Sequence, residues 1–181
     1  MKYATVIDLI ADKLKESDIP CVLIGGFAVN AYQVTRQTAD IDFLITAEDY
    51  PKISRLLQKE GYEEGGVSNV CGQLIGKSPF YWDIDFVFVD KDTLAKIRKD
   101  AQKIKIAGKD FLIPSLKHLL ALKLHALKNN TERRMAKDWV DIIALVEKAN
   151  MNVLSPEFKE LCLQYGTSDL YDKIITALGK K

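Results

Sequence analysis

Residues 25–45 read GGFAVNAYQVTRQTADIDFLI, and this stretch carries the strongest structural signals in the chain. Its two glycines directly follow the apolar run Cys21–Ile24, so we expect a short buried strand that turns sharply into a helix over Phe27–Val34. Glycine suits such a turn because it tolerates positive φ and lets the backbone approach a bound group closely. The first N–H groups of a helix lack partners within the helix and attract anions. We therefore expect Gly25 and Gly26 to line a phosphate site.

A pair of carboxylates closes the same stretch. Asp40 and Asp42 begin an expected strand over Asp40–Thr46, so they project from one face while Ile41 points to the other. Two adjacent carboxylates repel each other unless a proton or a cation neutralises them. Mg²⁺ typically takes one or two carboxylates together with substrate phosphates. A phosphate site beside a carboxylate pair indicates nucleotide chemistry with Mg²⁺ as the cofactor.

These residues carry a family resemblance. Gly-Gly, a helix, and then Arg36-x-Thr38-x-Asp40-x-Asp42 entering an apolar strand resemble the signature of the nucleotidyltransferase superfamily, the DNA polymerase β-like fold. The form in this chain is similar to a small bacterial branch that holds AbiEii-type toxin nucleotidyltransferases, related uncharacterised proteins and some aminoglycoside nucleotidyltransferases. The resemblance implies transfer of a nucleoside monophosphate from an NTP to an acceptor hydroxyl, with release of pyrophosphate.

A two-metal site needs a third carboxylate from another strand, because Asp40 and Asp42 alone leave one metal under-liganded. The expected strand Tyr81–Val89 offers Asp83 and Asp85 on one face. We favour Asp85, because the third acid of the family it resembles is directly followed by an apolar stretch. Asp85 is then placed to accept the proton of the acceptor hydroxyl as well. The alternative is that either aspartate of this strand is a solvated residue at the strand edge.

Basic and hydroxyl side chains accompany the acidic pair. Arg36 has the fork geometry that suits a phosphate, although a surface salt bridge is an equal alternative. Thr38 is expected to shape the turn on the nucleotide side of the site. Arg133, Arg134 and Lys137 form a basic cluster, which is either a solvated face or a docking patch for the acceptor.

The C-terminal part adds a Lys and an Asp on apolar helix faces. Lys123 interrupts the apolar stripe of an expected helix over Leu116–Lys128, and Asp138 lies in the stripe of an expected helix over Thr131–Lys148. The two form an ion pair within the helical lobe, point toward a ligand, or extend to solvent along the helix edge. The resemblance implies that Lys123 contacts the triphosphate and that Asp138 orients it or neighbouring basic groups.

Composition bounds the class of protein. The chain has 181 residues, 48% hydrophobic and 28% charged, which suits a globular domain with a helical appendage. A net charge of +1 gives no general attraction for RNA, so an RNA acceptor would need a local basic patch. The apolar runs are too short for a membrane span and no signal peptide is visible. Three scattered cysteines predict reduced thiols, and we expect a cytoplasmic protein.

Other site types lack their sequence signals. The chain contains no P-loop, EF-hand loop or Gly-x-Ser-x-Gly motif. His118 and His125 have no carboxylate or cysteine at zinc-ligand spacing, so we expect ordinary helix residues there.

The order of elements predicts an α+β fold, with a small mixed-sheet nucleotidyltransferase core over residues 1–113 and a helical lobe over residues 114–181 packed on it. Glycine and polar residues in Gly61–Ser78 indicate flexible edges around one strand at Val70–Ile75. The remaining expected elements are helices over Tyr3–Glu16, from a Thr46 cap through Lys59, over Asp92–Asp100, and from Pro156 and Ser168, with one strand over Lys103–Ile113.

The acceptor divides the functional hypothesis. An acceptor RNA such as a tRNA 3′ end would make the protein a toxin with an antitoxin partner, whereas a small hydroxylated molecule would make it an aminoglycoside-type modifying enzyme. A non-catalytic nucleotide-binding protein of the same fold, or a structural domain whose aspartates are solvated, are the alternatives to an enzyme.

Overall fold

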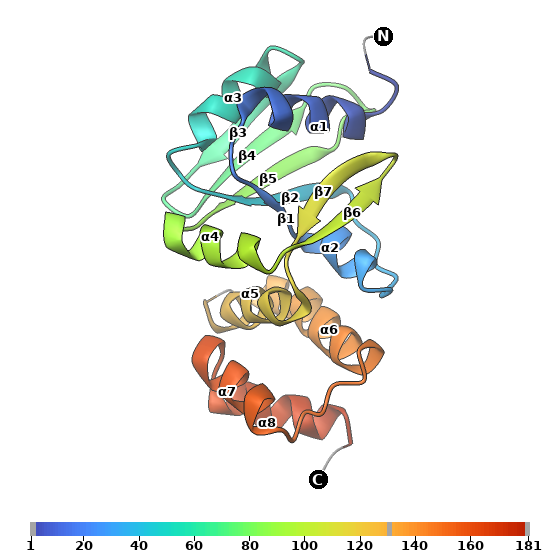
Figure 1. Ribbon diagram of the computed structural model, residues 1–181, viewed down its shortest axis with the longest axis vertical. Helices are drawn as coiled ribbons and strands as arrows, with labels where there is room; N and C mark the ends of the chain where they lie inside the picture. The colour runs from blue at the N-terminus through green and yellow to red at the C-terminus, as the bar shows by residue number, and fades with distance from the viewer. Residues whose placement is uncertain (1–2, 130–131, 180–181) are drawn as a thin grey trace. The chain divides into compact units, whose positions relative to one another are not determined.

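The structure is a computed structural model that describes residues 3–129 and 132–179, without the side chains of residues 132–135. It confirms the predicted α+β class, because a mixed sheet with helices precedes a helical region (Figure 1). The helices are α1 (Val6–Ser17), α2 (Gly25–Ala31), α3 (Tyr50–Gln58), α4 (Lys91–Lys99), α5 (Leu116–Asn129), α6 (Glu132–Lys148), α7 (Pro156–Tyr165) and α8 (Ser168–Ala177). The strands are β1 (Val22–Leu23), β2 (Asp40–Ile45), β3 (Tyr62–Val67), β4 (Cys71–Gly76), β5 (Asp83–Phe88), β6 (Gln102–Ile106) and β7 (Lys109–Ile113).

The chain divides into two compact units. The first combines Met1–Ala28 with Arg36–Ser115 and contains both sheets. The second combines Val29–Thr35 with Leu116–Lys181 and contains the four C-terminal helices. Among the described residues, every helix is too short or too polar to cross a bilayer.

The main sheet of the first unit has the strand order β1-β2-β5-β4-β3. The central strand β5 pairs in parallel with its neighbour β2, and every other pairing in this sheet is antiparallel. The parallel register sets Asp40 beside Asp83 and Asp42 beside Asp85. Because both strands are extended, this register places all four carboxylates on one face of the sheet.

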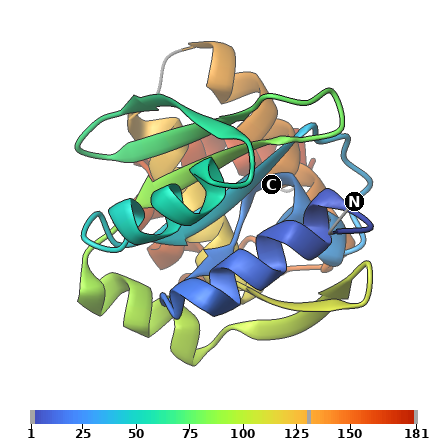
Figure 2. The same ribbon diagram turned by 90° about the horizontal axis from the view of Figure 1, so that it is seen from above.

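The opposite face of the sheet forms the core of the first unit. Ile41 and Phe43 of β2 and Ile84 and Phe86 of β5 are buried there, which accounts for the alternation of acidic and apolar residues in both strands. Phe43 stacks on Phe86 with ring centroids 5.9 Å apart, and Tyr50 of α3 meets Phe86 edge-on at 5.6 Å. Helices α1 and α3 pack together over this face (Figure 2). The acidic face is thus fixed by the burial of its reverse side.

The strand predicted at Val70–Ile75 is confirmed as β4, but the prediction of a flexible edge before it was wrong. Strands β3 and β4 form an antiparallel hairpin there, with a register irregularity between Glu64 and Gly66. Cross-strand pairing outweighs the poor strand propensity of Glu and Gly in β3, because β4 is already held by β5. The hairpin therefore adds two strands beside the carboxylates of β5.

The single strand expected over Lys103–Ile113 is also corrected. Strands β6 and β7 form a separate two-stranded sheet, joined by Ala107 and Gly108. Both turn residues have positive φ, 49° and 80°, which is the geometry of a type I′ hairpin turn. Alanine does not indicate positive φ, so the alternating sequence pattern predicted one continuous strand.

The bounds of α2 and the cap of α3 differ from prediction. Helix α2 begins at Gly25 and ends at Ala31, earlier than predicted at both ends. Thr46 does not cap α3; its hydroxyl donates to Asp49 Oδ2 at 2.7 Å, and Asp49 is the residue before the helix. The predicted start of α6 at Thr131 and the side chains of Arg133 and Arg134 lie outside the described residues.

We expect Ala107→Asn to raise the free energy of unfolding by about 1 kcal/mol, because asparagine tolerates the left-handed conformation that costs alanine roughly 1–2 kcal/mol. Urea denaturation of the whole chain measures the change. Gly108→Ala is the matched control of opposite sign, since it places a Cβ at a φ of 80°. Equal stability of the two variants would contradict the type I′ assignment.

Candidate active site

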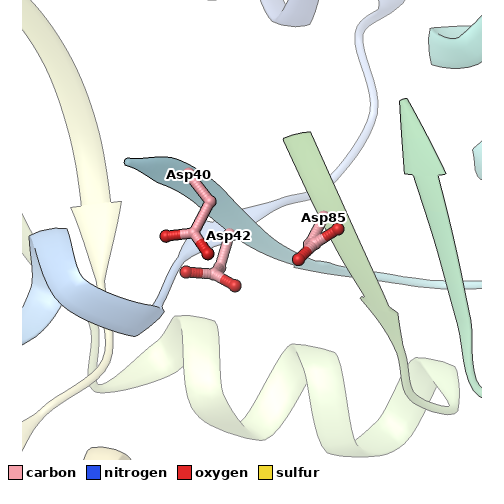
Figure 3. A group of neighbouring side chains, drawn as sticks. All are labelled: Asp40, Asp42 and Asp85. Atoms are coloured by element: carbon pink, nitrogen blue, oxygen red, sulfur yellow. The ribbon is translucent and has the colours of Figure 1, made fainter. Parts of the chain in front are cut away.

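Three carboxylates meet on the acidic face of the main sheet. One oxygen from each of Asp40, Asp42 and Asp85 can be chosen so that all lie within 4.8 Å of one another, and the three residues are half-buried. Asp40 and Asp42 come from β2 and Asp85 from β5, and their side chains gather above the two strands (Figure 3). The cluster is a direct product of the parallel register.

Asp83 has a different environment, although it lies beside Asp40 in the register. Its Oδ1 accepts a hydrogen bond from the backbone N–H of Gly76 at 3.1 Å, which ties it to the end of β4. Asp83 is not among the three carboxylates of the cluster. The geometry therefore separates the two candidates that the sequence offered and brings Asp85 to the pair on β2.

Two neutral side chains hold oxygens of the cluster. Thr38 Oγ1 donates to Asp40 Oδ1 at 2.7 Å, and Gln73 Nε2 donates to Asp85 Oδ1 at 2.9 Å. Gln73 lies on β4 directly opposite Asp85 in the antiparallel register. Each bond fixes one carboxylate oxygen without adding a positive charge.

The double glycine packs against the same cluster. Gly25 has a φ of 63°, and a Cβ built on it would overlap the carboxylate of Asp42. A Cβ on Gly26 would overlap Arg36 Nη1 and would lie 2.6 Å from Thr38 Oγ1. The corner between β1 and α2 thus admits no side chain, because residues of the acidic motif fill that space. Gly25 and Thr38 contact the carboxylates of Asp42 and Asp40, and Gly26 and Arg36 lie next to Thr38 and Gly26 in turn, all within the first unit.

The donor set fits Mg²⁺. Three carboxylates offer hard oxygen ligands, which Mg²⁺ prefers, and their mutual separation is short enough for shared cations. Outer hydrogen bonds of the kind made by Thr38 and Gln73 commonly orient the ligands of metal sites.

The second unit holds its own charged cluster. Lys123 Nζ donates to Asp138 Oδ1 at 2.9 Å and to Asp141 Oδ2 at 2.6 Å. The Lys123 and Asp141 side chains are only 8% and 4% exposed, so Lys123 does not extend to solvent. Of the arrangements considered from sequence, the ion pair between α5 and α6 is present; contact of Lys123 and Asp138 with a triphosphate stays a prediction.

A comparison of the sequence with protein families matches residues 1–178 to a family described as "Uncharacterised nucleotidyltransferase". The chain belongs to this nucleotidyltransferase family. Its acidic cluster is therefore the candidate catalytic site of a nucleotidyltransferase fold. No curated protein matches the sequence.

Solved structures share the fold of this nucleotidyltransferase at low identity. The antibiotic-resistance factor ANT(2″)-Ia, in complex with adenylyl-2″-tobramycin, is 14% identical, with 96% of this chain and 97% of that chain covered and a TM-score of 0.62. An antigenic nucleotidyltransferase-like protein from Paracoccidioides brasiliensis is 18% identical over 96% and 90% of the two chains, with a TM-score of 0.56. The lincosamide antibiotic adenylyltransferase LnuA, bound to lincomycin, is 18% identical over 77% and 94%, with a TM-score of 0.54.

From sequence, Gln73 was missed, and Asp141 was noted only as the last residue of a Lys137-Asp138-x-x-Asp141 pattern that the resemblance supplied, without a role of its own. Gln73 gave no signal of its own, because its contact with Asp85 depends on the pairing of β4 with β5. Asp141 did give a sequence signal. It stands three residues after Asp138, so both side chains can face the same neighbouring helix. Asp141 is the more buried partner of Lys123.

Gly25→Ala should lower the free energy of unfolding by at least about 2 kcal/mol, because it adds left-handed strain and an overlap with the Asp42 carboxylate. Gly66→Ala is the matched control, since, apart from residues 65–67 themselves, no heavy atom of the described chain lies within 4 Å of a Cβ at Gly66. We expect that control to stay within about 1 kcal/mol of the wild type. Urea denaturation tests both, and equal midpoints would show that the corner accommodates a side chain.

Lys123→Met should destabilise the fold by about 3–5 kcal/mol, because it leaves the buried Asp141 carboxylate without its cation. Lys128→Met changes an exposed lysine on the same helix and should stay within about 0.5 kcal/mol. Chemical denaturation followed by circular dichroism measures both values. A Lys123→Met protein as stable as Lys128→Met would refute the structural role of the cluster.

Proposed function

We propose that this protein transfers a nucleoside monophosphate from a nucleoside triphosphate to an acceptor hydroxyl and releases pyrophosphate. The observation that carries the proposal is the meeting of Asp40, Asp42 and Asp85 beside the glycine corner of a nucleotidyltransferase fold. In the reaction, the acceptor oxygen forms a bond to the α-phosphorus while the bond from that phosphorus to the bridging oxygen breaks. The acceptor proton leaves toward a base.

Asp40, Asp42 and Asp85 would hold Mg²⁺. The bound cation supplies charge stabilisation at the phosphate oxygens and orientation of the acceptor and leaving oxygens. Among the three, Asp85 is our choice for the proton acceptor, because it comes from the neighbouring strand and is held there by Gln73. The proposal requires all three side chains, since each supplies one carboxylate oxygen to the same cluster.

The other residues predicted from the sequence would bind the nucleotide. Arg36 lies against Gly26, where its guanidinium is adjacent to the acidic motif and suited to a phosphate. Gly25 and Gly26 leave this corner free of Cβ atoms. We propose the same nucleotide-binding role for Lys123 and Asp138 of the second unit, as the resemblance implies.

For the acceptor, we favour a small hydroxylated molecule. The net charge of +1 supplies no general attraction for a polyanion, and nucleic-acid binding depends strongly on such attraction. An RNA acceptor has one observation in its favour: residues 91–109 contain seven of the 26 Lys and Arg residues but only two of the 25 Asp and Glu. A toxin that acts on tRNA would use such a local patch.

Incubation of the protein with each α-³²P-labelled NTP, Mg²⁺ and an acceptor panel tests the proposal. We expect transfer that EDTA abolishes and that Asp42→Asn reduces by at least about 100-fold, because the variant loses one charge of the cluster. Asp83→Asn is the matched control and should keep its activity, since the amide oxygen can still accept from Gly76. The panel contains tRNA and hydroxylated small molecules such as aminoglycosides, so the labelled product reveals the acceptor class.

Three results would count against the proposal. Equal loss in Asp83→Asn and Asp42→Asn would remove the special role of the cluster. Tight NTP binding without pyrophosphate release would instead support a non-catalytic nucleotide-binding protein. Inactivity of the wild type with every NTP and acceptor class would exclude the transfer reaction under those conditions.

A further inference from the structure

We infer that Gln73 and Thr38 are positioning residues that set the metal affinity of the carboxylate cluster, each by fixing one oxygen of a different aspartate. The inference rests on the proposed function, because it assumes that Asp40, Asp42 and Asp85 hold a divalent cation. It goes further by assigning a role to Gln73, which belongs to none of the motifs in residues 25–45.

Gln73 is oriented by the hydrogen bond of its amide nitrogen. Nε2 donates to Asp85 Oδ1 at 2.9 Å, and a carboxylate can only accept, so the amide nitrogen must face Asp85. The amide oxygen then lies 3.1 Å from the position that a Cβ on Gly65 would occupy. Gly65 of β3 therefore leaves room for the far side of the amide. Rotation of Gln73 away from Asp85 would break this arrangement.

The strand that carries Gln73 is itself anchored. The ring of Tyr50 lies against Gly72, where a Cβ would stand 2.5 Å from Tyr50 Cζ. The Tyr50 hydroxyl donates to Glu64 at 3.4 Å and lies 3.5 Å from the backbone oxygen of Gln73. Burial raises the pKa of Tyr50 to about 12, so the hydroxyl keeps its proton at neutral pH and remains a donor. The backbone of Gln73 is thus fixed from the core side while its side chain serves the acidic face.

Thr38 makes the equivalent contact on the other strand. Its hydroxyl donates to Asp40 Oδ1 at 2.7 Å, and its Cβ lies 2.6 Å from the position of a Cβ on Gly26. Gly26 thus allows Thr38 to reach Asp40. Two of the three carboxylates of the cluster therefore receive a hydrogen bond from a neutral side chain that a glycine makes room for.

The neutrality of these donors matters. A lysine or arginine in the same position would fix the carboxylate but would also cancel part of the charge that attracts a cation. An amide or hydroxyl restrains rotation and leaves the charge of the cluster intact. Because like charges tend to turn apart, loss of either donor removes one restraint on the orientation of its aspartate. Outer hydrogen bonds of this kind typically contribute about 10–100-fold to metal affinity.

The test is titration of the full chain with Mn²⁺, without nucleotide, with free Mn²⁺ measured by electron paramagnetic resonance. We expect Gln73→Met and Thr38→Val each to raise the dissociation constant for Mn²⁺ by about 10–100-fold, because both keep the side-chain size but lose the donor. Thr38→Ser retains the hydroxyl and should restore binding to near the wild-type value. Thermal unfolding by circular dichroism verifies that the variants are folded.

Matched controls use the same residue types away from the cluster. Gln58 Nε2 donates to Ser54, and Thr46 Oγ1 donates to Asp49, so Gln58→Met and Thr46→Val remove comparable bonds. Neither should change Mn²⁺ affinity. If Gln73→Met fails to fold, Gln73→Asn replaces it, since this amide is one methylene shorter and should show the same loss.

The outcomes separate the two proposals. Wild-type Mn²⁺ affinity in Gln73→Met and Thr38→Val, with loss in Asp42→Asn, would overturn the positioning roles and leave the proposed function standing. Mn²⁺ binding by the wild type that Asp42→Asn does not weaken would overturn both. Loss of affinity in the Thr46 and Gln58 controls as well would show that the effect is not specific to the cluster and would also overturn the inference.

Discussion

The parallel pairing of β2 with β5 is the interaction on which the acidic face depends. Its register sets Asp42 beside Asp85, and the alternation of the strands keeps Asp40 on the same side. Two like charges about 4 Å apart repel by about 4 kcal/mol at an effective dielectric constant of 20, so the cluster opposes its own assembly. Burial of Phe43 and Phe86 on the reverse side holds the strands in this register. The apolar core therefore stabilises an arrangement that its polar face would not form alone.

The two units treat clustered carboxylates in opposite ways. In the second unit, Lys123 lies between Asp138 and Asp141 and neutralises much of their charge within the protein. In the first unit, the donors Thr38 and Gln73 are neutral, so they orient Asp40 and Asp85 without removing charge. A carboxylate pair held by a buried lysine suits a structural role, whereas neutral donors orient carboxylates without competing for the site of an external cation.

Much of the first unit could be predicted from the sequence because its signals are local. The alternation in β2 and β5 predicted which residues share a face, and the family resemblance, applied to the apolar run after Asp85, favoured it over Asp83. The contact of Gln73 with Asp85 could not be predicted, because it depends on the pairing of β4 with β5, and residue periodicity does not reveal which strands pair. The turn at Ala107 could not be predicted either, since alanine does not indicate positive φ. Hydrophobic periodicity predicts neither long-range strand pairing nor unusual backbone conformations.

The packing of Asp42 against Gly25 couples the identities of two positions that are seventeen residues apart. A side chain at the first position and a carboxylate at the second would compete for the same volume, so position 25 cannot gain a side chain while the carboxylate of residue 42 keeps its present place. Divergence of a related sequence toward a larger residue at position 25 should therefore accompany loss of the acid at position 42. The residues at these two positions would then distinguish relatives that have lost the cation site from relatives that retain it.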